Sequence, residues 1–233
     1  MDALTGEACR EEARKKLYWI ACSVMKDEIA PHLTSEDTLF VLDHSLHRTP
    51  DKMRETLQAE ILKADAWEGD AVILGYGLCS NGAAGLRAGR HPVVIPRVHD
   101  CISLFLGSSA RYLAEHGKEP GTYFLTRGWI DEKKTPLYTI EEYAERFDRE
   151  TAEWVIREEL KNYTRIALVD SGLGLEERHR SHALETARFL GLRLEELQGS
   201  PALFRKMATG PWDGEFVVLN PGEESKQEAF LDL

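Results

Sequence analysis

The chain has 233 residues, of which 42% are hydrophobic, and its formal net charge is −11 at pH 7. This composition can supply a hydrophobic core, and the acidic excess argues against a protein that grips the nucleic-acid backbone through a basic face. The sequence has no apolar run of the roughly eighteen residues that a membrane helix needs, and residues 1–16 have no apolar signal stretch. We therefore expect a cytoplasmic protein with no nucleic-acid partner and no membrane partner.

Strand-like and helix-like segments alternate along the chain. The apolar, strand-length segments are residues 17–22, 37–43, 71–75, 92–95, 122–126, 165–170, 192–197 and 215–219. Helical spacing of apolar residues covers 50–67, 101–117, 139–162, 176–190 and 201–209, with a break in the third near Phe147. The alternation predicts an α/β fold with a doubly wound, mainly parallel twisted sheet and helices on both faces. We expect one domain over 17–219, an N-terminal arm or helix over 1–16, and a polar C-terminal tail over 220–233.

The cysteines fall where such a sheet keeps its ligands. Cys9, Cys22, Cys79 and Cys101 are too few for a disulfide scaffold in a chain of this length. Cys22, Cys79 and Cys101 follow the first, third and fourth predicted strands, whereas Cys9 lies in the charged N-terminal segment. Because ligands bind at the carboxyl ends of parallel strands, these three cysteines indicate a thiol or metal site at that edge.

Two histidines could complete a metal site. Thiolate and imidazole together suit zinc, so the predicted ligands are Cys22, Cys79 and Cys101 with His99 or His44. His99 lies two residues before Cys101, and His44 follows the second strand, three residues before His47. Three alternatives stay open: an iron–sulfur cluster on the thiolates, a metal-free reactive cysteine at a helix N-terminus, and cysteines that only pack in the core.

The glycine-rich turn around Cys79 has two interpretations. Gly77, Ser80 and Asn81 could bind a ligand through the turn, because successive backbone N–H groups can receive an anion. The turn matches neither the dinucleotide-binding pattern nor the P-loop pattern. Alternatively, the glycines allow a sharp bend that carries Cys79 inward.

Three further side chains follow predicted strands. Arg97 and Arg127 could meet an anionic substrate or pair with a neighbouring carboxylate, and Trp129 could form the wall of a pocket or pack in the core. Together these residues suggest that a small anionic or thiol-bearing molecule is the ligand. The charged stretch 141–159 is either a subunit surface of a homo-oligomer or a solvated face.

Five motifs resemble one uncharacterised family, the domain-of-unknown-function family 1638 of anaerobes and methanogens. They are I-A-C at 20–22, L-G-Y-G-L-C-S-N-G at 74–82, I-P-R-V-H-D-C at 95–101, Y-F-L-T-R-G-W at 123–129 and D-S-G-L-G at 170–174. The resemblance extends from about residue 17 to residue 219. It implies that Cys22, Cys79 and Cys101 are the site cysteines. It also implies an association with corrinoid-dependent methyltransferases of anaerobic one-carbon metabolism.

The favoured hypothesis is a metal-dependent enzyme, with zinc as its cofactor, that activates a thiol or transfers a methyl or alkyl group. A second hypothesis is a non-catalytic protein that binds a metal or a corrinoid and delivers it to a corrinoid protein or methyltransferase. A third is an iron–sulfur protein. The metal content of the protein separates the first from the third.

Overall fold

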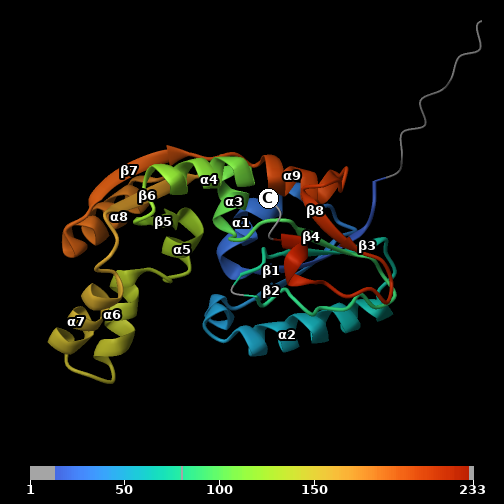
Figure 1. Cartoon of the computed structure of the whole chain (residues 1–233), viewed down its shortest axis with the longest axis horizontal. Coiled ribbons are helices and arrows are strands. Elements are labelled where there is room, and N and C mark those ends of the chain that lie inside the picture. The colour runs from blue at the N-terminus through green and yellow to red at the C-terminus, as the bar shows by residue number, and fades with distance from the viewer. Residues whose placement is uncertain (1–13, 80, 231–233) are drawn as a thin grey trace, which may run out of the picture.

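The computed structural model describes residues 14–79 and 81–230, and the strands within these ranges form two sheets (Figure 1). The larger sheet has the strand order β2-β1-β3-β4-β8. Its strands are β1 (Leu17–Cys22), β2 (Thr38–Leu42), β3 (Ala71–Gly75), β4 (Val93–Pro96) and β8 (Phe216–Leu219). All neighbours pair in parallel except β4 and β8, which are antiparallel.

The smaller sheet is entirely parallel and has the order β5-β6-β7. Its strands are β5 (Thr122–Thr126), β6 (Arg165–Asp170) and β7 (Arg193–Gln198). Each of these eight strands lies within one residue of its predicted position, and the α/β class with mainly parallel pairing is confirmed. The alternation of elements did not indicate that the strands divide between two sheets.

Helices lie around and between the sheets, as Figure 1 shows. They are α1 (Lys26–Ile29), α2 (Pro50–Lys63), α3 (Ile102–Leu106), α4 (Ser109–Lys118), α5 (Arg127–Asp131), α6 (Pro136–Ala144), α7 (Arg149–Glu159), α8 (Glu177–Leu190) and α9 (Ala202–Thr209). Short 3-10 turns occur at η1 (Ser23–Met25), η2 (Ala30–His32), η3 (His44–Arg48), η4 (Ala64–Ala66) and η5 (Gln227–Phe230). None of the helices in the described ranges is long and apolar enough to cross a membrane.

The predicted helix over 101–117 is two helices, because Gly107 takes a left-handed conformation with φ of 89°. A β-carbon at Gly107 would lie 2.6 Å from the β-carbon of Ser200, so glycine suits this turn both for its conformation and for its size. The next helix, α4, begins at once, since the Ser108 hydroxyl accepts a hydrogen bond of 3.1 Å from the backbone N–H of Arg111.

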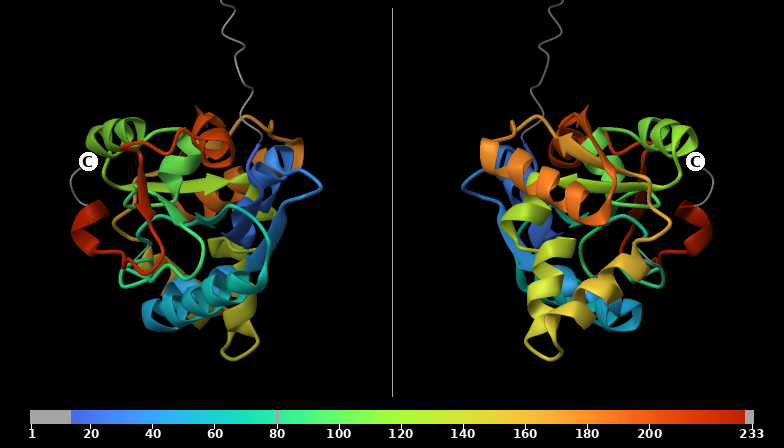
Figure 2. Two further views of the ribbon diagram at one scale, coloured as in Figure 1. Left: turned by 90° about the vertical axis from the view of Figure 1, so that its right-hand side faces the viewer. Right: turned by 90° about the vertical axis from the view of Figure 1, so that its left-hand side faces the viewer.

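The predicted helix over 139–162 is also a pair, with α7 capped by Asp148, whose carboxylate accepts from the backbone N–H of Thr151 at 2.9 Å. The pair α6–α7 projects from the rest of the molecule (Figure 2). It has a small hydrophobic cluster of its own around Ile140, Ala152 and Ile156.

One larger hydrophobic cluster joins the two sheets. It contains every residue of β1 and extends to Leu125 of β5 and Leu168 of β6. The backbones approach closely at Gly128 in α5, where a β-carbon would lie 1.7 Å from the carbonyl oxygen of Val24 in η1. Because of this contact, the carboxyl ends of β1 and β5 face the same region between the sheets.

Residues 220–230, within the predicted polar tail, pack against the loop that follows β3. The Ser225 hydroxyl donates to the carbonyl of Ala83 at 2.7 Å and accepts from the backbone N–H of Leu86 at 2.9 Å. Phe230 is fully buried. The segment therefore supports the loop that contains Cys79.

Candidate functional site

The parallel pairing places the carboxyl ends of β1 to β4 at one edge of the larger sheet. Cys22 is the last residue of β1 and is paired in register with Leu42, the last residue of β2. The chain after β2 forms η3, which contains His44 and His47. The chains after β3 and β4 contain Cys79 and Cys101, so this edge collects the three predicted cysteines.

Backbone contacts bring Cys79 beside Cys101. The N–H of Leu78 donates to the carbonyl of Val98 at 2.9 Å, and the N–H of Cys79 donates to the carbonyl of His99 at 3.4 Å. A β-carbon at Gly77 would lie 2.7 Å from the carbonyl oxygen of Val98, so glycine permits this approach. Cys79 itself has a φ of 43°, an uncommon conformation for a residue other than glycine. The interpretation of the turn as a bend that carries Cys79 inward agrees with this geometry.

The thiols of Cys79 and Cys101 form a hydrogen-bonded pair. The Cys101 thiol donates to the Cys79 sulfur, and this bond is the main reason that the pKa of Cys79 falls to about 6, against the opposing effect of burial. The same bond, together with burial and the charge of Asp100, raises the pKa of Cys101 well above its ordinary value. Cys22, Cys79 and Cys101 are all free and buried. Of the two thiols, Cys79 therefore loses its proton first.

His47 links Cys22 to this pair. Burial opposes the charged imidazolium, but interaction with the sulfurs of Cys22 and Cys79 raises the pKa of His47 to about 10. The Nε2 atom of His47 is buried and, among the described residues, has no partner in hydrogen-bonding geometry. At that pKa the ring is protonated at neutral pH, so Nε2 can act as a metal donor only where a metal ion displaces its proton.

Tyr76 lies against the same cluster. Its ring stacks on that of His47, with centroids 5.7 Å apart. Burial, and then the charges of Cys22, Cys79 and Cys101, raise the pKa of the Tyr76 hydroxyl. This hydroxyl is also buried without a hydrogen-bond partner in the described part of the chain. Tyr76 is therefore a neutral wall of the cysteine cluster.

The two histidines that the sequence suggested as ligands lie in different surroundings. His44 stacks on His47 with a centroid distance of 4.9 Å, and burial followed by the charge of His47 lowers its pKa to about 4. His99 is exposed. His47, although noted for its spacing from His44, was not among the predicted ligands. The three-residue spacing places both histidines in one short turn, but it does not tell which ring faces the thiols.

The other predicted binding residues are scattered. Ser80, like Cys9, lies outside the described residues, and Asn81 is exposed with a φ of 68°. Arg97 donates to the carbonyls of Ala229 and Gly214, at 2.8 and 3.4 Å.

Arg127 lies among carboxylates rather than at the cysteine cluster. Its guanidinium nitrogens are 3.4 Å from Asp131, 3.8 Å from Asp27 and 4.0 Å from Glu176. Of the two readings that the sequence left open for Arg127, the structure therefore shows the carboxylate pairing.

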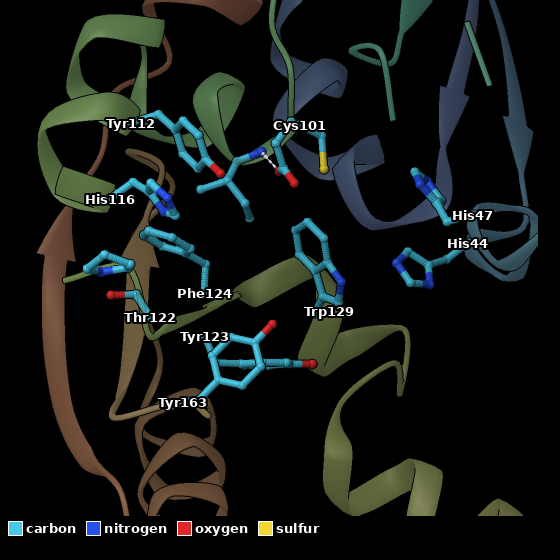
Figure 3. A pocket seen from close by; sticks show the side chains of 13 residues that line it. His44, His47, Cys101, Tyr112, His116, Thr122, Tyr123, Phe124, Trp129 and Tyr163 are labelled. Atoms are coloured by element: carbon cyan, nitrogen blue, oxygen red, sulfur yellow. Dashed lines mark hydrogen bonds between the residues drawn. The ribbon is translucent and has the colours of Figure 1, made fainter. Parts of the chain in front are cut away.

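A cavity of about 350 Å³ opens beside the cluster, between the two sheets. Cys101, His44 and His47 lie on one side of it, and Trp129 lies next to them (Figure 3). Trp129 therefore forms part of the wall of a pocket. The remaining wall consists largely of aromatic side chains from α4, β5 and the chain that follows α7.

A buried carboxyl group close to Arg127 was not anticipated from the sequence. Glu28 in α1 is 3% exposed and accepts a hydrogen bond of 2.9 Å from the hydroxyl of Ser171, the residue after β6. The two residues are 143 positions apart, and no local pattern marks them as neighbours.

Within the described residues, no three His, Cys, Asp or Glu side chains already stand in the arrangement of a metal centre. The donors Cys22, Cys79, Cys101 and His47 instead form a line of contacts, in which His47 meets Cys22 and Cys79, and Cys79 meets Cys101. Their chemistry nevertheless suits a soft divalent ion, because three sulfurs and one imidazole nitrogen form a common donor set for zinc. The unpartnered Nε2 of His47 is the observation that fits such an ion.

The fold and the site define an α/β protein with a cysteine–histidine cluster at the strand ends. The model of the family described as "protein of unknown function (DUF1638)" matches residues 41–208, and the chain belongs to this family. The matched range contains Cys79, Cys101 and His47, and it begins after Cys22. No curated protein and no solved structure matches the chain.

Proposed function

We propose that the protein is a metal-dependent enzyme that binds zinc through the thiolates of Cys22, Cys79 and Cys101, with Nε2 of His47 as the fourth donor. The observation that carries the proposal is the buried, unpartnered Nε2 of His47, which lies next to two of the three sulfurs. A buried polar atom without a partner is costly, and a bound ion would satisfy it.

The chain already favours part of the deprotonation that metal binding requires. The pKa of Cys79 is about 6, because the Cys101 thiol donates a hydrogen bond to it and His47 adds a positive charge, so this sulfur is mostly thiolate at neutral pH. Zinc, when bound, would keep all three thiols deprotonated while leaving their sulfurs nucleophilic. Closing the site requires the paired side chains to turn toward a common point.

Cys101 is the residue through which the cluster would act on a ligand. It belongs to the donor set and also lines the cavity. We infer that its sulfur accepts an alkyl group from a donor in the cavity. In that reaction a sulfur–carbon bond forms, the bond between carbon and the leaving group breaks, and the leaving group departs with the electron pair.

The test is the metal content of protein purified without air, measured by mass spectrometry. We expect about one zinc ion per chain, and a large loss of zinc in each of the variants Cys79→Ser, Cys101→Ser and His47→Ala. Cys9→Ser is the matched cysteine control, and His99→Ala is the histidine control. Both should keep their metal. Circular dichroism on each variant separates loss of the ion from loss of the fold.

The same samples distinguish the other hypotheses. A brown protein that contains iron and sulfide would show that the site holds an iron–sulfur cluster and not zinc. If the folded protein contains no metal and its Cys79 reacts rapidly with iodoacetamide, the site is a reactive thiol and not a metal centre. A metal-replete protein that accepts no alkyl group but transfers its metal or a corrinoid to a methyltransferase would support the delivery hypothesis.

A further inference from the structure

The wall of the cavity beside Cys101 is rich in aromatic side chains. Five of its lining residues are aromatic: Tyr112, Tyr123, Phe124, Trp129 and Tyr163. Figure 3 shows Tyr112 and Phe124 on one side of the opening, Tyr123 and Tyr163 below it, and Trp129 toward the histidines. The cavity volume of about 350 Å³ lies at the lower end of the range for small-molecule sites. The cavity therefore suits a small ligand.

The aromatic rings face in different directions. The planes of Tyr123 and Tyr163 are at 79° with centroids 5.4 Å apart, and those of Tyr112 and Phe124 are at 42° with centroids 6.0 Å apart. Rings that are inclined to one another in this way can surround a compact, rounded group.

The cavity wall carries charges of both signs, with Asp100 as its acidic side chain and His47, whose pKa is raised by the neighbouring sulfurs, as its cationic one. Among the thirteen described residues that line it, none is Lys or Arg, and Asp100 is the acidic member. The Oδ1 atom of Asp100 accepts from the backbone N–H of Ile102 at 2.8 Å. The pKa of Tyr112 is raised by burial and then by the charge of Asp100, which places this charge next to the aromatic wall. Arg97 and Arg127, the basic residues expected to hold an anion, lie elsewhere.

We propose that this cavity binds a small organic cation, such as an alkylated ammonium ion, through the faces of its aromatic rings and the carboxylate of Asp100. A cation is attracted to aromatic faces by their negative electrostatic potential, and the attraction increases where water is excluded. The inference deepens the proposed function, because it names the class of ligand beside Cys101, and it rests on that function for what the ligand does there.

The test compares two compounds of equal shape and different charge. Choline and its uncharged analogue 3,3-dimethylbutan-1-ol are titrated separately into the full-length protein, and binding is measured by calorimetry. We expect choline to bind about tenfold more tightly, the ratio that corresponds to a cation–aromatic interaction of ordinary strength. Equal affinity for the two compounds, or no saturable binding of either, would overturn the inference, as would preferential binding of a carboxylate such as 3,3-dimethylbutanoate.

Conservative variants link the preference to the proposed residues. Tyr163→Phe keeps the ring and should bind choline like the unaltered chain, whereas Tyr163→Leu should weaken choline severalfold and leave the uncharged analogue unaffected. Asp100→Asn keeps the acceptor for the N–H of Ile102 and should also weaken choline alone. If neither variant changes the ratio of the two affinities, these residues do not recognise the cation and the assignment is wrong.

The outcome does not depend on the metal. The calorimetric comparison is repeated on protein treated with a chelator, in which the cavity wall is unchanged in composition. Choline preference in a protein that contains no metal as purified would leave this inference standing and remove the proposed zinc centre. A protein that contains zinc but does not prefer choline would support the zinc centre and overturn this inference.

Discussion

Glu28 makes a defined contribution to the pH dependence of stability. Its carboxyl group is 3% exposed, Oε1 accepts from the Ser171 hydroxyl, and Oε2 is buried with no hydrogen-bond partner among the described residues. Burial raises its pKa from the ordinary 4.5 to about 7, although the Ser171 hydrogen bond and the charge of Arg127 oppose this change. We predict that Glu28→Gln removes a pH-dependent cost of folding.

The sign and size follow from proton linkage. The folded chain holds the Glu28 proton more tightly than the unfolded chain, so this group makes the free energy of unfolding fall as pH rises from about 4.5 to about 7. Above about pH 7 the contribution of Glu28 to the free energy of unfolding falls no further. At about 1.4 kcal/mol for each pH unit between the two pKa values, the full effect is about 3 kcal/mol.

Urea unfolding of both proteins between pH 4.5 and pH 8.5 measures this effect. Only the difference between Glu28→Gln and the unaltered chain is used, because the remaining acidic residues contribute to both. Relative to the unaltered chain, Glu28→Gln should gain about 3 kcal/mol between the two ends of the range. The exposed Glu55 on α2 is the control, and Glu55→Gln should give a flat difference. A flat difference for Glu28→Gln as well would show that Glu28 does not hold its proton in the folded chain.

Two other predictions concern buried contacts in the fold, and both are read from urea unfolding. Gly128→Ala places a methyl group against the Val24 carbonyl and should destabilise the fold by about 1–3 kcal/mol or more, whereas Gly117→Ala, with open space in α4, should stabilise it by up to about 1 kcal/mol. Equal effects of the two changes would contradict the close contact. Arg165 has a side chain only 3% exposed and pairs with three glutamates, so Arg165→Ala should cost about 3–5 kcal/mol. The exposed Arg149 pairs within its own helix, and Arg149→Ala should cost less than about 1 kcal/mol, so similar losses would refute the role of burial.

Much of the local structure could be predicted from the sequence. Strand positions followed from short apolar segments, since side-chain burial and backbone propensity act over a few residues. The same reasoning placed Cys22, Cys79 and Cys101 after three strands. Because parallel strands end at one edge, their convergence required no further information.

The site beyond the cysteines could be predicted only in part. The sequence noted both His44 and His47, but the turn η3 decides that His47 meets the sulfurs while His44 stacks behind it. Tyr76 follows β3 directly and looks like part of an apolar strand. Its role as a wall of the cluster depends on contacts with three other segments of the chain.

The sequence by itself determined which segments form the strands, where the longer helical stretches lie, and that three thiols end on one edge of a parallel sheet. The tertiary structure decided how the strands divide between two sheets, where Arg127 finds its carboxylates, and that an aromatic cavity lies between the sheets. The physical reason is the range of the interactions. Burial patterns repeat over two to four residues, whereas contacts such as Gly128 with Val24 and Glu28 with Ser171 join segments that only the packed core brings together.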